Sequence, residues 1–127
     1  MDITDLMTND YVFNEYNRKP EKVQEVYKET KKVMLDYNDL YDMDDISPIA
    51  LNDEILEKIG FMRSEGLYKF RDSGFVMKKF EEGCYTTEKL SEGKDTLRES
   101  RMIRYVHELQ DTMRLYGLHD EADNIEL

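Results

Sequence analysis

The chain has 127 residues, of which 39% are hydrophobic and 37% are charged, and its formal net charge is −11 at pH 7. No stretch approaches the roughly 20 apolar residues of a membrane-spanning helix, so we expect no membrane partner. The acidic balance opposes direct binding to nucleic acid, because phosphates repel a surface of the same charge.

The first element in chain order is the segment 20–40, whose pattern fits two structures. Apolar residues and tyrosines recur at helical spacing, with Pro20 where a helix could begin. The same segment also alternates as two strands around a turn at 28–31. In that arrangement one face of each strand carries Val23 and Tyr27, and then Val33, Leu35 and Tyr37. Periodicity alone slightly favours the helix, and the hairpin stays open as the alternative.

An acidic stretch follows, with seven acids and no lysine or arginine from Asp36 to Glu54. One interpretation is a solvated loop that keeps the protein soluble. A second is a docking surface for a basic partner protein. A third is a calcium site, although "DLYDMDDISP" lacks the glycine and the acid spacing of an EF-hand loop. The candidate partner-binding residues of this stretch are Asp36, Asp39, Asp42, Asp44 and Asp45.

A short helix is predicted at about 53–59. Asn52 is the expected N-cap, and Gly60 is the expected stop. Leu51 and Leu56 have the spacing of a hydrophobic staple, which would fix the direction in which the chain enters the helix.

Strands are predicted after this helix. "LYKF" (67–70) and "FVMKKF" (75–80) flank "RDSG", a hairpin turn in which Gly74 can supply a positive φ. "CYTTEKL" (84–90) is a third expected strand, followed by a turn at "SEGK" (91–94).

A second helix is predicted at about 100–116, because its apolar residues step by three and four. Gly117 and Leu118 predict a Schellman cap at its end. Its start is less well defined: Thr96 and Glu99 could form a capping box, but "RESRM" could equally end a strand. The residues of the apolar face are Met102, Ile103, Tyr105, Val106, Leu109, Met113 and Tyr116.

Three phrases of the chain resemble small uncharacterised proteins of Bacteroides-type phages, prophages and mobile elements. They are "TNDYVF" (8–13), "DISPIALNDEILEKIGF" (45–61) and "IRYVHELQ" (103–110). The resemblance covers most of the chain. It implies strands in the N-terminal segment and an accessory gene of a mobile element that works in a bacterial cytoplasm. It implies no activity and no catalytic residue. The matching residues are Pro48, Ile49, Leu51, Glu54, Leu56, Lys58, Gly60 and Phe61, then Tyr105, Val106, His107, Leu109 and Gln110.

Candidate chemistry is sparse. His107 and Glu108 form an "HE" pair, but a zinc-protease helix needs a second histidine four positions after the first, and that position is Asp111. We therefore predict no metal and no cofactor. His107 and Gln110 are expected to hydrogen-bond to the neighbouring sheet, and together with Tyr105 they are further candidate partner-binding residues. Cys84 has no basic neighbour or paired histidine, which indicates a half-buried strand cysteine and not a nucleophile.

We predict an α+β fold, with a small antiparallel sheet or partly open barrel and two helices, about 53–59 and 100–116, packed on it. Residues 1–118 form the expected domain, and 119–127 an acidic, flexible tail. The lone cysteine and the absence of a signal-peptide pattern predict a cytoplasmic protein.

The function predicted from these features is a non-enzymatic protein-interaction accessory protein of a phage or mobile element. Its partner would be a protein, either a basic host protein or a second copy of the chain. One alternative is an acidic, nucleic-acid-mimicking inhibitor of a host defence or nucleic-acid-handling enzyme. Another is a small-ligand-binding protein or hydrolase.

Overall fold

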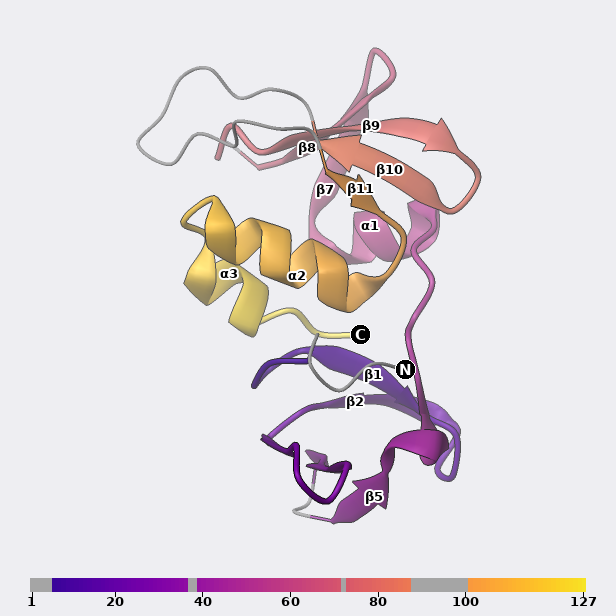
Figure 1. Cartoon of the computed structure of the whole chain (residues 1–127). Coiled ribbons are helices and arrows are strands. Elements are labelled where there is room, and N and C mark those ends of the chain that lie inside the picture. The colour runs from indigo at the N-terminus through magenta and orange to yellow at the C-terminus, as the bar shows by residue number, and fades with distance from the viewer. Residues whose placement is uncertain (1–5, 37–38, 72, 88–100) are drawn as a thin grey trace. The chain divides into compact units, whose positions relative to one another are not determined.

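The computed structural model describes residues 6–36, 39–71, 73–87 and 101–127 (Figure 1). The predicted α+β class is confirmed, because the described strands form three antiparallel sheets that are accompanied by helices. None of these sheets closes into a barrel. The chain divides into two compact units, 1–49 and 50–127, so the boundary falls inside the range that the sequence analysis treated as one domain.

The unit 1–49 consists of two small sheets. One has the order β2-β1-β6 and the other the order β3-β4-β5. Valines, leucines, Met43 and Ile46 from both sheets form its apolar core. The elements are β1 (Tyr11–Asn14), β2 (Lys19–Lys22), β3 (Glu25–Tyr27), β4 (Lys32–Met34), β5 (Leu40–Asp42), a 3-10 helix (Met43–Asp45) and β6 (Ile46–Ser47).

The segment 20–40 is a hairpin, so the strand alternative is confirmed and the helical one is wrong. β3 and β4 pair antiparallel with Val26 opposite Val33, and Lys31 takes a positive φ of 55° in the turn between them. β5 pairs with the other side of β4 and places Tyr41 opposite Val33. Because β4 pairs with β3 on one side and β5 on the other, its backbone groups are hydrogen-bonded as they would be within a helix. The strands also bury their apolar face. Tyr37 lies outside the described residues.

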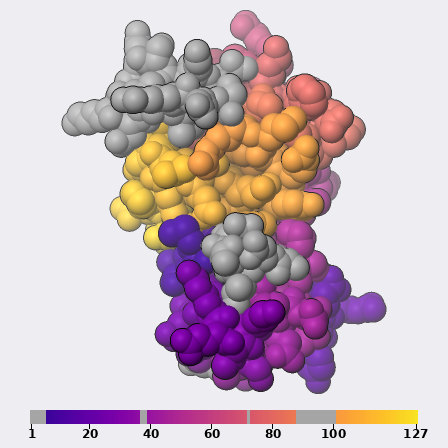
Figure 2. Space-filling model, in the orientation of Figure 1, coloured from indigo at the N-terminus to yellow at the C-terminus, as the bar shows by residue number. Residues whose placement is uncertain are grey.

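The unit 50–127 is a five-stranded antiparallel sheet of order β11-β10-β9-β8-β7, with helices on one face (Figure 1). The third helix packs against the second, and the two form a continuous surface in the space-filling view of Figure 2. None of the described helices is long and apolar enough to cross a membrane. The elements are α1 (Asp53–Ile59), β7 (Phe61–Ser64), β8 (Leu67–Phe70), β9 (Val76–Glu81), β10 (Cys84–Thr87), β11 (Met102–Ile103), α2 (Val106–Leu115) and α3 (His119–Asp123).

The local signals around α1 and the central strands are confirmed. The Asn52 side chain accepts a hydrogen bond from the Ile55 N–H at 2.8 Å, and Gly60 ends the helix with a φ of 126°. β8 and β10 fall within the predicted strands, β9 extends one residue beyond its predicted end at 80, and Gly74 has the expected positive φ of 83°. The predicted turn at 91–94 and the capping box of Thr96 and Glu99 lie outside the described residues.

The second helix begins later than predicted, at Val106 and not at 100. Met102 and Ile103 pair with β10 as strand β11, so the alternative that this region ends a strand is confirmed. The Glu108 carboxylate accepts the backbone N–H groups of Arg104 (2.9 Å) and Tyr105 (3.1 Å), which starts the helix after the strand. The predicted Schellman cap is confirmed: the Leu118 N–H reaches the Met113 carbonyl at 2.8 Å, and the Gly117 N–H reaches the carbonyl of Arg114 at 3.0 Å.

Residues 119–127 do not form the predicted flexible tail. They contain helix α3, and Ala122 and Ile125 are buried. The Gln110 side chain donates to the Ala122 carbonyl at 2.9 Å, and the Arg114 guanidinium pairs with Asp123 at 3.1 Å. A segment that looks highly charged in sequence is therefore ordered by two side chains of α2.

Candidate functional site

A polar cluster of the unit 50–127 is built on the carboxylate of Asp53. This residue opens α1 and faces the sheet. One carboxylate oxygen, Oδ1, accepts the hydroxyl of Tyr85 at 2.7 Å and the hydroxyl of Tyr68 at 2.9 Å. The two tyrosine rings meet edge to face, with centroids 5.3 Å apart. The helix start is thereby tied to β8 and β10.

Two cations complete the cluster. Lys79 Nζ lies 3.3 Å from Asp53 Oδ2 and 2.9 Å from Glu82 Oε1, and Arg63 NH1 lies 3.5 Å from Asp53 Oδ2. The Arg63 guanidinium also lies over the Tyr68 ring, 5.6 Å from its centroid. Both Asp53 oxygens are therefore engaged, and the side chain is still 40% exposed to solvent.

The hydrogen bonds of this cluster shift the pKa values of its members. The hydrogen bond from the Tyr85 hydroxyl, followed by those from the Tyr68 hydroxyl and the Lys79 ammonium group, holds the pKa of the Asp53 carboxyl below its usual value, against an opposing effect of burial. Burial and the bond to Asp53 raise the pKa of both tyrosines. An ionised carboxylate that is a weak base and already accepts several donors is poorly suited to general-base catalysis. The cluster is better suited to fixing the start of α1 against the sheet and to keeping the Asp53 carboxylate ionised.

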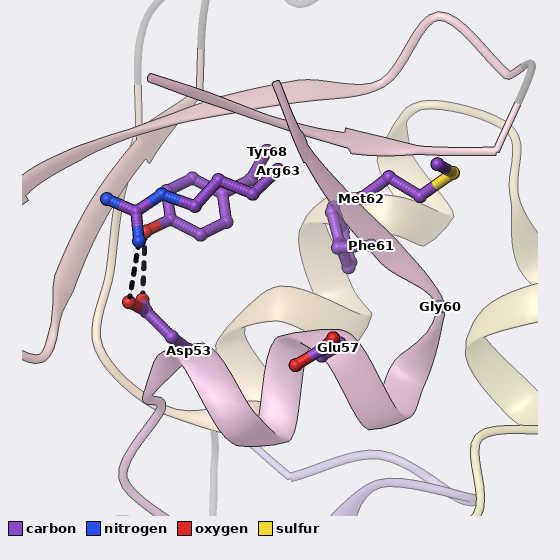
Figure 3. Close-up of a pocket in the computed structure, with 7 residues that line it drawn as sticks. All are labelled: Asp53, Glu57, Gly60, Phe61, Met62, Arg63 and Tyr68. Carbon is purple, nitrogen blue, oxygen red and sulfur yellow. Dashed lines mark hydrogen bonds and ion pairs between the residues drawn. The ribbon is translucent and has the colours of Figure 1, made fainter. Parts of the chain in front are cut away.

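A groove of about 530 Å³ lies beside this cluster, between α1 and β7 (Figure 3). This volume is in the range of ordinary ligand-binding clefts. In Figure 3, Arg63 and Tyr68 reach over to Asp53, and Glu57 stands one turn further along α1 with no interaction drawn to it. The groove is lined by Asp53, Glu57, Gly60, Phe61, Met62, Arg63 and Tyr68.

Strand β7 is an edge of its sheet and runs along this groove. It joins β8 through a two-residue turn in which Glu65 and Gly66 both have positive φ, 53° and 81°. In such a turn the flanking residues, Ser64 and Leu67, exchange backbone hydrogen bonds, and this pattern alternates along the hairpin. The N–H and C=O groups of Phe61 and Arg63 therefore point away from β8. In the described part of the chain no backbone group pairs with them.

The sheet face opposite the helices carries exposed apolar side chains. Met62 is 70% exposed, Phe80 63% and Met102 45%. Strand alternation places Leu67 and Val76 on this same face, together with Lys69 and Lys78. Met62 and Met102 lie on opposite edge strands of this face, with Lys69 and Lys78 on the strands between them.

The acidic residues predicted as a docking surface lie in the unit 1–49, and they differ in whether their side chains have partners within the chain. Asp36 accepts the Lys22 N–H at 3.2 Å and the Gln24 side chain at 3.4 Å. Asp42 lies 3.8 Å from Lys32 Nζ on the surface. Asp39, Asp44 and Asp45 are exposed, the last two within the short 3-10 helix.

The three other predicted residues, from the start of α2, do not line the groove beside Asp53. Gln110 is buried and donates a hydrogen bond to the Ala122 carbonyl of α3. His107 is buried too, and its ring stacks on that of Tyr105 with centroids 5.9 Å apart. Cys84 is a strand cysteine as predicted, but it is fully buried and not half-buried.

The groove itself was missed by the sequence analysis. Asp53 and Glu57 are recognisable as helix residues, and Arg63 and Tyr68 as strand residues, but nothing local shows that they share a site. The one sequence signal was the turn "SEGL" (64–67), which has the composition of a two-residue hairpin and would have identified β7.

No three histidine, cysteine, aspartate or glutamate side chains of the described residues are grouped so as to hold a metal ion. A search of protein-family models, curated proteins and solved structures finds no match to this chain.

Proposed function

We propose that this chain is a non-enzymatic protein-binding protein, and that its unit 50–127 binds an extended segment of another protein as an added strand beside β7. The observation that carries this proposal is the open edge of β7 next to a groove. Strand addition is a recurring mode of peptide recognition, in which the main chain supplies affinity and adjacent pockets supply specificity.

The surroundings of β7 support the proposal in two further ways. The outward groups of Phe61 and Arg63 offer two donors and two acceptors, which a partner strand would match. The exposed Met62 side chain then borders the same partner strand on the far face of the sheet. A bound segment would therefore contact the protein through its backbone and through both rows of its side chains.

The resemblance to proteins of mobile elements favours a host protein as the partner. The acidic-inhibitor alternative draws on the exposed Asp39, Asp44 and Asp45. It is less well supported, because Asp36 and Asp42 already have partners within the chain. A small-ligand function would use the same groove but would not need the β7 edge, so the two functions can be told apart.

The test is a matched pair of substitutions at Arg63. Arg63→Pro removes the outward N–H and leaves the bonds to β8 intact, whereas Arg63→Ala removes only the side chain. Twelve-residue peptides selected from a display library on the full chain are then measured against both variants by fluorescence anisotropy. We expect Arg63→Pro to weaken binding about tenfold or more and Arg63→Ala to weaken it much less.

A second measurement avoids any effect on folding. In a selected peptide, N-methylation of alternate residues should abolish binding when the methylated N–H faces β7, and should leave binding unchanged at the intervening residues. If both sets of methylated peptides bind equally, or if Arg63→Pro binds as the unaltered protein does, the proposed function is wrong.

A further inference from the structure

We infer that the segment added beside β7 carries a lysine or arginine at the position that enters the groove, and that Glu57 recognises it. This inference rests on the proposed function and specifies its partner: a strand whose inward row is basic and whose outward row is apolar.

The first step is the direction of the partner's side chains. In a sheet, residues opposite one another on neighbouring strands point to the same face. Phe61 and Arg63 point to the face that holds α1, and Met62 points to the other face (Figure 3). A partner residue opposite Phe61 or Arg63 therefore enters the groove, and its two neighbours point to the far face of the sheet, one of them opposite Met62.

The second step is the charge of the groove. Asp53 is already matched by Arg63 at 3.5 Å and by Lys79 at 3.3 Å. Among the described residues Glu57 has no hydrogen bond or ion pair through its carboxylate, although it lines the groove. One negative charge is therefore left without a partner in the space that the incoming side chain occupies. An oppositely charged group is favoured there, and a carboxylate is repelled.

The third step is the shape of the incoming side chain. The groove wall next to Glu57 is apolar, because it is formed by the ring of Phe61 and by Gly60. Lysine and arginine place an aliphatic stem against such a wall while the charged end reaches a carboxylate. A short polar side chain would contact neither. On the far face, Met62 is 70% exposed and would be covered by apolar partner residues.

The probe is a set of disulfide-cyclised hairpin peptides whose outer strand reads Thr-Val-X-Val-Thr, where X is lysine, arginine, glutamine or glutamate. They are titrated against the full-length chain and its variants by fluorescence anisotropy. For the unaltered protein we expect lysine and arginine to bind about tenfold more tightly than glutamate. Glu57→Gln should remove this preference, and Glu57→Lys should reverse it in favour of the glutamate peptide.

Glu54→Gln is the matched control, because Glu54 is an exposed acid of the same helix that does not line the groove. It should keep the preference for lysine and arginine. If all four peptides bind alike and Arg63→Pro still abolishes binding, the inference is wrong and the strand addition stands. If the peptides bind equally to Arg63→Pro, or none binds, both the inference and the proposed function are wrong.

Discussion

At the scale of single residues, Asp53 decides how α1 meets the sheet. Its carboxylate receives hydroxyl groups from β8 and β10 and ammonium and guanidinium groups from β9 and β7. The Tyr85 hydroxyl lies on a fully buried side chain, so losing its acceptor would leave a polar group without a partner in the core. This one acid therefore supports both the fold of the unit and the wall of the groove.

We predict that Asp53→Asn lowers the free energy of unfolding by about 1 kcal/mol at pH 7, a modest value because the carboxylate is partly exposed. The effect should depend on pH. The pKa of the Asp53 carboxyl is lower in the folded chain than in the unfolded chain, so its stabilisation is fully present above the unfolded pKa, about 4. It is lost as the pH falls through the folded pKa. Urea unfolding from pH 7 down to about pH 2 should show the two proteins converging in stability.

Two tyrosine variants provide the control for this prediction. Tyr85 gives the largest contribution to the lowered pKa of Asp53, ahead of Tyr68. Tyr85→Phe should therefore raise the carboxyl pKa more than Tyr68→Phe, as measured by NMR titration. A stability difference between Asp53→Asn and the unaltered protein that stays constant down to pH 2 would contradict the prediction.

Part of this site could be predicted from local sequence, and part could not. The Asn52 cap and the start of α1 at Asp53 follow from neighbouring residues and are observed. The meeting of Tyr85 with Asp53 depends on an irregularity between Cys84 and Tyr85, where the register between β9 and β10 shifts. Both residues are buried as a result, which breaks the alternation on which strand prediction relies. Register across strands is a non-local property that no single segment reveals.

At the scale of elements, the start of α2 and the order of the last nine residues show how tertiary contacts overrule local pattern. Met102 and Ile103 have helical spacing with the rest of α2, yet they pair with a strand that precedes them by more than a dozen residues. α3 is short and highly charged, so its own propensity is marginal. A hydrogen bond from Gln110 and an ion pair with Arg114, both residues of α2, stabilise α3.

We predict that ending the chain after Leu118 destabilises the protein by about 2–4 kcal/mol, because the buried Ile125 and Ala122 are lost together with the hydrogen bond from Gln110 to the Ala122 carbonyl. Urea unfolding of the shortened and full-length chains measures this. Glu126→Ala, a change at an exposed position of the same segment, should have almost no effect. Equal stability of the two chain lengths would instead support the flexible tail predicted from sequence.

At the scale of the whole molecule, the chain forms two compact units, 1–49 and 50–127. Chain length alone does not indicate where such a division lies. The unit 1–49 closes its two sheets over a small core of valines, leucines, Met43 and Ile46. The unit 50–127 contains every residue of the Asp53 cluster and of the groove.

We predict from this division that the fragment 50–127 folds alone and keeps the β7 site, whereas the fragment 1–49 is unfolded or marginally stable. A unit of 1–49 buries too small a share of its surface to offset the conformational entropy of its chain. Amide NMR spectra of the two fragments measure the difference: the peaks of 50–127 should be dispersed and overlie those of the full chain. Dispersed peaks from 1–49 with collapsed peaks from 50–127 would show that the strand-binding unit depends on the rest of the chain.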